Sequence, residues 1–239
     1  MLGICGDATL VDITHDVPPQ DILTGALELA AACPFFPAGT IFLVVVDPGV
    51  GSARRGLAVE AGGFRFVAPD NGLLTAVLDA HEATGAVELT ERRYARASVS
   101  RTFEGRDRFA PAAAWLAAGV ALSALGRPAD SLTRLDIPRP RVADEAIDGE
   151  VLRVDRFGNA ITNIDRALVQ RAIGNGAVDV RIGSHAVPAF VSTYADVAVG
   201  QICALFGSGD LLEVAARGGS AADVLAVGRG TRVRVARRA

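Results

Sequence analysis

A buried apolar run meets a charged turn in the stretch Val44-Val45-Val46-Asp47-Pro48-Gly49-Val50-Gly51-Ser52-Ala53-Arg54-Arg55. Pro48 stops a strand, and the two glycines allow backbone geometry that other residues avoid. Ligands in open α/β sheets collect at the carboxyl ends of strands, which puts Asp47 where chemistry usually occurs. The alternative interpretation is a structural Asp turn at a strand end, with both arginines facing solvent.

Composition narrows the class of protein. The 239 residues are half hydrophobic, enough for one large domain or two smaller ones. The net charge is −3 with arginine spread along the chain, so neither nucleic acid nor a membrane surface is an expected partner. All 24 basic residues are arginine, which excludes lysine Schiff-base chemistry. The three cysteines and three histidines are scattered, so no metal site is expected. Without a membrane-length apolar run or a signal-peptide pattern at the start, a cytoplasmic protein is expected.

The first part of the chain alternates between strand and helix patterns. This alternation predicts an α/β domain over residues 1–140, with a mainly parallel central sheet flanked by helices. Asp21 is the expected N-cap of the first helix, and Gly62-Gly63 the turn between two strands. The strands are expected at 9–13, 39–46, 57–60 and 64–68, and the helices at 22–33, 73–81 and 108–118.

The pattern changes after a proline-punctuated linker, Ile137-Pro138-Arg139-Pro140-Arg141. Short apolar runs separated by glycine turns follow, which is typical of a small antiparallel barrel or sandwich. We therefore expect a smaller, mostly antiparallel β domain over residues 141–239. Its strands are expected at 149–154, 177–182, 186–190, 201–206 and 231–235.

A dense group of charges precedes the helix at 108–118, in Thr102-Phe103-Glu104-Gly105-Arg106-Asp107-Arg108. A purely structural interpretation is available, in which Asp107 caps the helix and Arg106 pairs with a neighbouring acid. The other interpretation joins Glu104 to the first stretch. Carboxylates at positions 47 and 104 with Arg54 between them would form a site in which two acids share one cation.

The second domain carries aromatic rings next to polar side chains. Asp155-Arg156-Phe157-Gly158-Asn159 offers a carboxylate, a ring and an amide, and Thr193-Tyr194-Ala195-Asp196 offers a second ring. Two such rings can sandwich a planar purine, although core packing is the commoner role of each ring taken alone. Glycine-rich turns at 207–210 and 217–220 can present backbone amides to a ligand, but hairpin turns have the same pattern.

Taken together and in order, these segments resemble the S-adenosylmethionine (SAM) hydrolases, or SAM hydroxide adenosyltransferases, which are relatives of fluorinase and chlorinase. The resemblance begins at Ile13-Thr14-His15-Asp16-Val17-Pro18-Pro19-Gln20-Asp21 and includes Val46-Asp47-Pro48-Gly49-Val50-Gly51 and Ala68-Pro69-Asp70-Asn71-Gly72. It continues through the Glu104, Phe157 and Tyr194 segments to residues 212–222, and so covers nearly the whole chain.

The resemblance implies an α/β domain followed by a β-rich domain, assembled as a homotrimer. Each active site of the family lies between the first domain of one subunit and the second domain of the next. Hydrolases of the family use an Asp-Arg-His set, whose Asp falls on Asp47 and whose Arg falls on Arg54. Halogen-transferring relatives have an aromatic residue at the Asp47 position, so this chain is similar to the water-using branch.

The resemblance also assigns substrate contacts. Phe157 and Tyr194 fall on the rings that hold adenine, and Asn159 on an amide beside the base. Asp155 and Ser208 fall on the positions that hold the amino-acid end of the substrate. The remaining expected contacts are Arg217 and Gly218 in the loop whose backbone reads the base, with Asn71 and Phe103 as lining residues.

The chain departs from the family at two places. The histidine of the family's Thr-Phe-His-Gly-Arg-Asp motif is Glu104 here, and the family's first strand and helix have no counterpart before Met1. The second departure predicts a start codon assigned too late, or else a truncated protein.

The expected reaction is attack of an oriented water on C5′ of SAM, giving adenosine and L-methionine without a metal or other cofactor. Asp47, Arg54 and Glu104 are the expected catalytic residues. The alternatives are a SAM- or adenosine-binding protein without turnover and, third, a halide-using adenosyl transferase.

Overall fold

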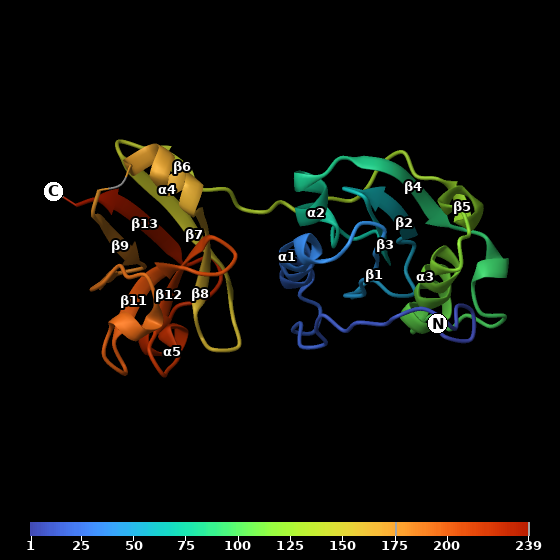
Figure 1. The fold of residues 1–239 in the computed structure, drawn as a ribbon, viewed down its shortest axis with the longest axis horizontal. Helices are drawn as coiled ribbons and strands as arrows, with labels where there is room; N and C mark the ends of the chain where they lie inside the picture. The colour runs from blue at the N-terminus through green and yellow to red at the C-terminus, as the bar shows by residue number, and fades with distance from the viewer. Residues whose placement is uncertain (175, 239) are drawn as a thin grey trace. The chain divides into compact units, whose positions relative to one another are not determined.

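A computed structural model describes residues 1–174 and 176–238. Its internal contacts divide the chain into two compact units, Met1–Ile137 and Pro138–Ala239. The first unit runs from blue to green in Figure 1 and the second from yellow-green to red. Each unit has its own sheet and its own buried core, so each is described by itself.

The sheet of the first unit is mixed. Its strands lie in the order β1-β3-β2-β4-β5, and of these pairings β1 with β3 is parallel while the others are antiparallel. The expectation of a mainly parallel sheet is therefore wrong: three of the four neighbouring strand pairs are antiparallel, and a tight turn joins β2 directly to β3 where a crossover helix was expected. The strands are β1 (Ile41–Leu43), β2 (Gly56–Ala61), β3 (Phe64–Pro69), β4 (Ala83–Leu89) and β5 (Gly126–Pro128).

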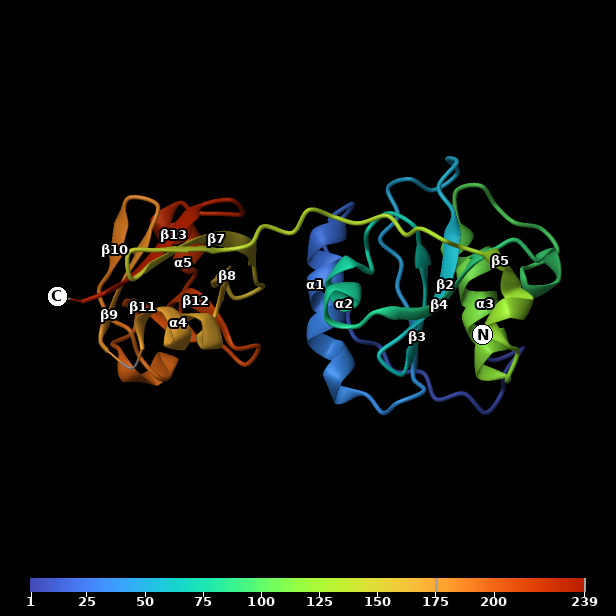
Figure 2. The ribbon, with the colours of Figure 1, turned by 90° about the horizontal axis from the view of Figure 1, so that it is seen from above.

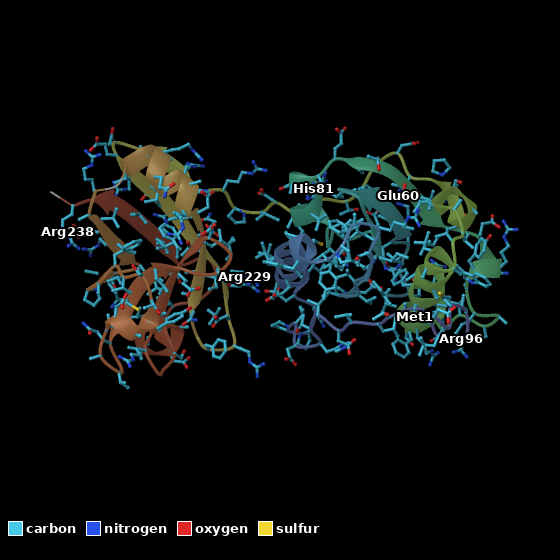
Figure 3. All side chains as sticks on the ribbon, in the orientation of Figure 1. Met1, Glu60, His81, Arg96, Arg229 and Arg238 are labelled. Carbon is cyan, nitrogen blue, oxygen red and sulfur yellow. The ribbon has the colours of Figure 1, made fainter. Side chains whose placement is uncertain are left out.

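The turn between β2 and β3 is the one expected from the sequence. Gly62 and Gly63 both have positive φ, at 59° and 80°, which glycine adopts without a steric penalty. A Cβ on Gly62 would also lie 2.7 Å from Cγ of His81, a residue labelled in Figure 3. Two glycines at this turn thus fix an antiparallel hairpin in the middle of the sheet.

Helices cover both faces of this sheet, as Figure 2 shows, with α1 and α2 on one side and α3 on the other. Alternation along the strands supplies both cores: Leu57 and Val59 of β2 face α1 and α2, whereas Ala58 faces α3. The Asp21 carboxylate accepts a hydrogen bond from the Thr24 amide, which confirms it as the N-cap of α1. The helices are α1 (Ile22–Ala32), α2 (Thr75–Ala80) and α3 (Ala110–Ala117), and a π-helical segment, Gly105–Phe109, leads directly into α3.

The prediction of a strand at residues 9–13 is wrong. This segment has no strand pairing, and Leu10, Val11 and Ile13 are largely exposed. An apolar run becomes a strand only where a neighbouring backbone offers hydrogen bonds and a face to pack against. The strand expected at 39–46 is shorter than predicted, although the Val44 amide still donates to the Val67 carbonyl at 3.0 Å beyond the end of β1.

The second unit is an antiparallel sheet that nearly closes on itself. Its strand order is β10-β9-β13-β7-β8-β12-β11, with β6 paired to β7. An isolated bridge between Phe190, just after β10, and Ala204 on β11 brings the two edges together. The strands are β6 (Arg141–Ala143), β7 (Ala146–Val154), β8 (Ala160–Asp165), β9 (Val178–Ile182), β10 (His185–Val187), β11 (Ile202–Phe206), β12 (Leu211–Ala216) and β13 (Arg232–Arg237).

This arrangement confirms a mostly antiparallel β unit and adds elements that the sequence analysis did not expect. Strands β8 and β12 and two short helices, α4 (Arg166–Ile173) and α5 (Ala221–Leu225), are among them. The inner faces of β7, β8, β12 and β13 meet in one apolar core, which includes Ile147, Ile164, Leu212 and Val233. Within the residues described, no helix is long and apolar enough to cross a membrane.

Candidate active site

The first group of candidate residues lies where the chain leaves β1. Nδ2 of Asn71 donates to the Val46 carbonyl at 2.8 Å, and Oδ1 of Asn71 accepts from the Leu73 amide at 3.2 Å. Asn71 therefore ties the loop after β3 to the residue that precedes Asp47. Its side-chain amide fixes the backbone that carries the carboxylate.

Arg54 joins the two carboxylates that the sequence analysis singled out. Nε of Arg54 donates to Oδ1 of Asp47 at 2.9 Å, and Nη2 of Arg54 donates to Oδ2 of the same group. The same Nη2 lies 2.6 Å from Oε2 of Glu104. All three side chains are nearly buried, with exposed fractions of 9% for Arg54, 6% for Asp47 and 12% for Glu104. The expected site, in which two acids share one cation, is present in the fold.

The turn between Asp47 and Arg54 is built by its glycines and serine. Gly51 has φ of 79°, and a Cβ there would lie 2.6 Å from the Arg101 carbonyl oxygen. The Ser52 hydroxyl donates to the Gly49 carbonyl at 2.6 Å and accepts from the Arg54 amide at 3.2 Å. Position 51 therefore requires glycine both for its backbone angle and for space.

The electrostatics of this group keep Arg54 charged. Burial lowers the pKa of Arg54, but the hydrogen bonds and charges of Asp47 and Glu104 outweigh burial and raise it. The guanidinium also lies over the Phe109 ring, 5.1 Å from its centroid. Arg108 places a second cation 3.8 Å from Oε1 of Glu104. Two cations thus balance two acids in a largely dehydrated cluster.

Glu104 is placed by the π-helical segment that follows it. Segments of this kind are rare and frequently occur at functional sites. Asp107, within the segment, is buried and accepts hydrogen bonds from Arg106 and from the Ser100 amide, at 2.7 and 2.9 Å. The structural interpretation is thus correct for Arg106, which pairs with Asp107, and wrong for Asp107, which lies inside the π-helical segment and does not cap α3. Phe103 is more than half exposed and lies under the Arg106 guanidinium.

The second group of candidate residues starts with the turn between β7 and β8. Oδ1 of Asp155 accepts from the amides of Phe157 and Asn159, both at 2.9 Å, and Oδ2 accepts from Nδ2 of Asn159 at 2.9 Å. Asp155 was expected at the amino-acid end of the substrate. In this structure both of its oxygens also hold the turn that carries Phe157 and Asn159.

Phe157 projects from this turn with 71% of its surface exposed. Core packing, the alternative left open for this ring, is therefore wrong. Gly158 has φ of 84°, and a Cβ there would collide with Ser220, 2.1 Å from Oγ. The Ala222 amide donates to the Gly158 carbonyl at 2.9 Å. The loop at 217–220 therefore lies beside the turn that bears the exposed ring.

Arg217 and Tyr194 belong to one connected structure. Nη1 of Arg217 donates to the carbonyls of Val197 and Ala195, at 2.6 and 3.2 Å. The Ala195 carbonyl belongs to the helical turn Tyr194–Asp196, and the Val197 carbonyl follows that turn directly. The capping box of the turn is formed by Thr193 and Asp196. Gly218, with φ of 72°, follows Arg217. The guanidinium fixes the segment that carries the Tyr194 ring.

Two further features complete the second group. Ser208 lies exposed in the loop between β11 and β12. Glu213, on β12, was not expected from the sequence: it is buried and accepts a hydrogen bond from the Tyr194 hydroxyl. A signal was present, since a single acid interrupts the apolar run Leu211-Leu212-Glu213-Val214-Ala215-Ala216.

The structure thus gathers Asp47, Arg54, Glu104, Asn71 and Phe103 in or beside the loops of the first unit. It gathers the other seven candidates in loops of the second unit. Among the residues described, no three His, Cys, Asp or Glu side chains lie together as metal ligands would.

Comparison with known proteins identifies the family. Residues 1–126 match the model of the SAM hydroxide adenosyltransferase N-terminal domain, and residues 149–234 match that of its C-terminal domain. The chain belongs to the SAM hydroxide adenosyltransferase family. It is 45% identical to the (R)-S-adenosyl-L-methionine hydrolase of Salinispora tropica, an alignment that covers 95% of this chain and 85% of that protein.

A fluorinase and a solved structure are also similar to this chain. The fluorinase of an Actinoplanes species is 31% identical over 84% of this chain and 78% of its own length. A crystal structure of an uncharacterized conserved protein from Thermotoga maritima has a TM-score of 0.92 at 36% identity, and covers 99% of this chain and 92% of that one. The SAM hydroxide adenosyltransferase fold therefore extends across nearly the whole chain.

We predict that Asp107→Asn makes the protein less stable at neutral pH and flattens its acid response. The hydrogen bonds of Arg106 and of the Ser100 amide hold the pKa of Asp107 well below its usual range. An acid with a lowered folded pKa contributes stability above its unfolded pKa of about 4, and that contribution is lost as the pH falls. The difference in unfolding free energy between wild type and variant, measured in urea, should shrink from pH 7 to pH 3. A constant difference would contradict the assignment, and Asp130→Asn, at an exposed carboxylate, is the matched control.

Proposed function

We propose that this chain hydrolyses S-adenosyl-L-methionine to adenosine and L-methionine, at a site whose catalytic residues are Asp47, Arg54 and Glu104. The observation that carries the proposal is the nearly buried Asp47 carboxylate, held through both oxygens by Arg54 at the end of β1. The hydrolase relative at 45% identity supports the same reaction.

The reaction is a displacement at C5′ of the ribose. A water oxygen forms the new bond to C5′ while the C5′–S bond breaks. The electron pair of the C5′–S bond goes to the sulfonium sulfur, which leaves as the neutral thioether of methionine. The proton of the water passes to Asp47 late, once the new C–O bond has made it acidic. Because a carboxylate is a weak base toward water, holding the water in line contributes more than removing its proton.

Arg54 sets the orientation of Asp47 in this mechanism. Its two donors, Nε and Nη2, meet the two oxygens of the carboxylate side by side, an arrangement that fixes the plane of the group. The lone pairs that remain on Asp47 can accept from a water. Glu104 accepts from the same Nη2 of Arg54, so it acts on Asp47 through Arg54.

The substrate contacts proposed for the first domain, residues 1–140, are Asn71 and Phe103. Those for the second domain, residues 141–239, are Asp155, Phe157, Asn159, Tyr194, Ser208, Arg217 and Gly218. Phe157 and Tyr194 present flat faces to adenine, while the Asp155 carboxylate and the Ser208 hydroxyl suit the charged amino-acid end. We propose no cofactor, and we place the protein in the cytoplasm, where its three free thiols stay reduced.

Heavy-oxygen water tests the reaction. The purified protein, incubated with SAM in ¹⁸O-water, should release L-methionine and adenosine labelled at the 5′ oxygen. Unlabelled adenosine would contradict attack by water, and 5′-chloroadenosine formed faster than adenosine in physiological chloride would support the halide-using alternative. Binding of SAM without either product would support the non-catalytic alternative. Asp47→Asn is the control that separates enzymatic from spontaneous cleavage.

We predict that Glu104→Gln lowers kcat/KM about five- to tenfold. The amide oxygen can still accept from Arg54, but a charge-assisted hydrogen bond is about twice as strong as a neutral one, so the guanidinium is held less firmly. Steady-state kinetics measure the effect, with Glu60→Gln as the control because Glu60 pairs with Arg65 on the hairpin. Unchanged kinetics in Glu104→Gln would make Glu104 a bystander and leave catalysis to Asp47 and Arg54.

We also propose a homotrimer with active sites shared between subunits, as in the family that the sequence resembles. Light scattering should give three times the chain mass. Inactive Asp47→Asn and Phe157→Ala proteins, mixed in equal amounts after mild unfolding, should regain about one quarter of wild-type activity. In trimers that form at random from such a mixture, one site in four combines an intact first domain with an intact second domain. A fully active monomer, or no recovery on mixing, would contradict shared sites.

A further inference from the structure

Glu213 is a buried carboxylate in the middle of an otherwise apolar strand. Its exposed fraction is 6%, and it pairs across the sheet with Leu205 on β11 and Ile161 on β8. Its strand neighbours Leu212 and Val214 point into the main core, so Glu213 faces the opposite side of the sheet. The side chain therefore leaves the apolar core and faces the loops that carry the candidate substrate contacts.

Two of those loops touch the carboxylate directly. Oε1 of Glu213 accepts a hydrogen bond from the Tyr194 hydroxyl. A Cβ on Gly207 would lie 2.5 Å from Oε2 of Glu213, so the loop that leads to Ser208 is packed onto the other oxygen. Glu213 thus lies between the ring proposed for adenine and the loop proposed for the amino-acid end.

A charged carboxylate at this buried place lowers the stability of the folded protein. Burial raises the pKa of Glu213 and so does the negative charge of Asp155, while the Tyr194 hydrogen bond lowers it. A leucine of similar size would avoid this cost, and replacing buried charges by apolar groups is often neutral or stabilising. A buried carboxylate with a raised pKa, next to residues of a candidate site, points to a functional role.

The Tyr194 ring gains a fixed orientation from this contact. It is 40% exposed, so packing alone leaves a large part of it free. Arg217 fixes the backbone that follows Tyr194. The capping box of Thr193 and Asp196 fixes the backbone both before and after Tyr194. Backbone contacts leave the side-chain torsions free, whereas a hydrogen bond at the far end of the ring restrains them.

The two exposed rings of the second unit are therefore anchored in the same way. Asp155 holds the turn beneath Phe157, and Glu213 holds the hydroxyl of Tyr194. Preorganised rings bind a flat ligand better because less freedom is lost on binding. We propose that Glu213 is a positioning residue, which holds the Tyr194 ring in the orientation that stacks on adenine; this inference rests on the proposed function.

A double-mutant cycle on adenosine binding tests the inference. Calorimetry on the full chain gives the adenosine Kd for wild type, Glu213→Leu, Tyr194→Phe and the double variant. Each single change should weaken binding about 2- to 12-fold, the range for loss of one hydrogen bond. The double variant should be no weaker than either single one, because both remove the same contact. Glu213→Gln, whose amide oxygen can accept from the hydroxyl, should stay within about twofold of wild type.

Kinetics separate positioning from a general loss of structure. Glu213→Leu should raise KM for SAM while kcat stays within about twofold, as expected when binding is lost equally in the ground and transition states. Asp179→Asn, an exposed acid paired with Arg238 on the same unit, is the matched control.

Additive effects in the double variant, or unchanged affinity in Tyr194→Phe, would overturn the inference. Tyr194→Phe keeps both the ring and the fold, so it decides the question even if Glu213→Leu does not fold. Wild-type protein that binds adenosine with these dependences but does not cleave SAM would overturn the proposed function alone. Wild-type protein that does not bind adenosine would overturn both.

Discussion

The guanidinium of Arg54, clamped between Asp47 and Glu104, is the interaction on which the first unit's loops depend. Removing Arg54 would leave the nearly buried carboxylates of Asp47 and Glu104 without their shared cation, and breaking a buried ion pair in this way costs far more than an exposed ion pair gains. The surrounding backbone holds the three side chains of this cluster in place. Gly51 passes against the Arg101 carbonyl, and a π-helical segment presents Glu104. The geometry of the cluster therefore constrains both loops that leave the sheet at this place.

The second unit uses carboxylates differently. Asp155 accepts three hydrogen bonds from its own loop and so rigidifies the turn that displays Phe157. Glu213 accepts a hydrogen bond from the hydroxyl of Tyr194, which lies in the segment between β10 and β11. Both acids hold aromatic rings that are exposed at the surface of the unit. In the proposed function, Arg54 orients a carboxylate for chemistry, and the two acids of the second unit orient rings for binding.

Much of the local structure could be predicted because its causes are local. Asp21 accepts from Thr24, three residues away, and the glycines of the β2–β3 turn adopt their angles within two residues. The strand expected at 9–13 failed because a strand depends on a neighbour that the segment's own sequence does not supply. The prediction of a mainly parallel sheet was wrong for a related reason: alternation of strands and helices does not reveal which strands become neighbours, and here three of the four neighbouring pairs are antiparallel.

The sequence by itself determined the two-part α/β and β organisation, the family, and the identity of the candidate residues, because these are carried by residue types in a fixed order. Only the tertiary structure decided what those residues do for one another. Arg54 and Glu104 are 50 positions apart, and Tyr194 and Glu213 are 19 apart. Their contacts arise from the packing of separate strands and loops. The role of Glu213 could not be inferred from its place in an apolar run, because the hydroxyl that it binds is brought to it by the fold.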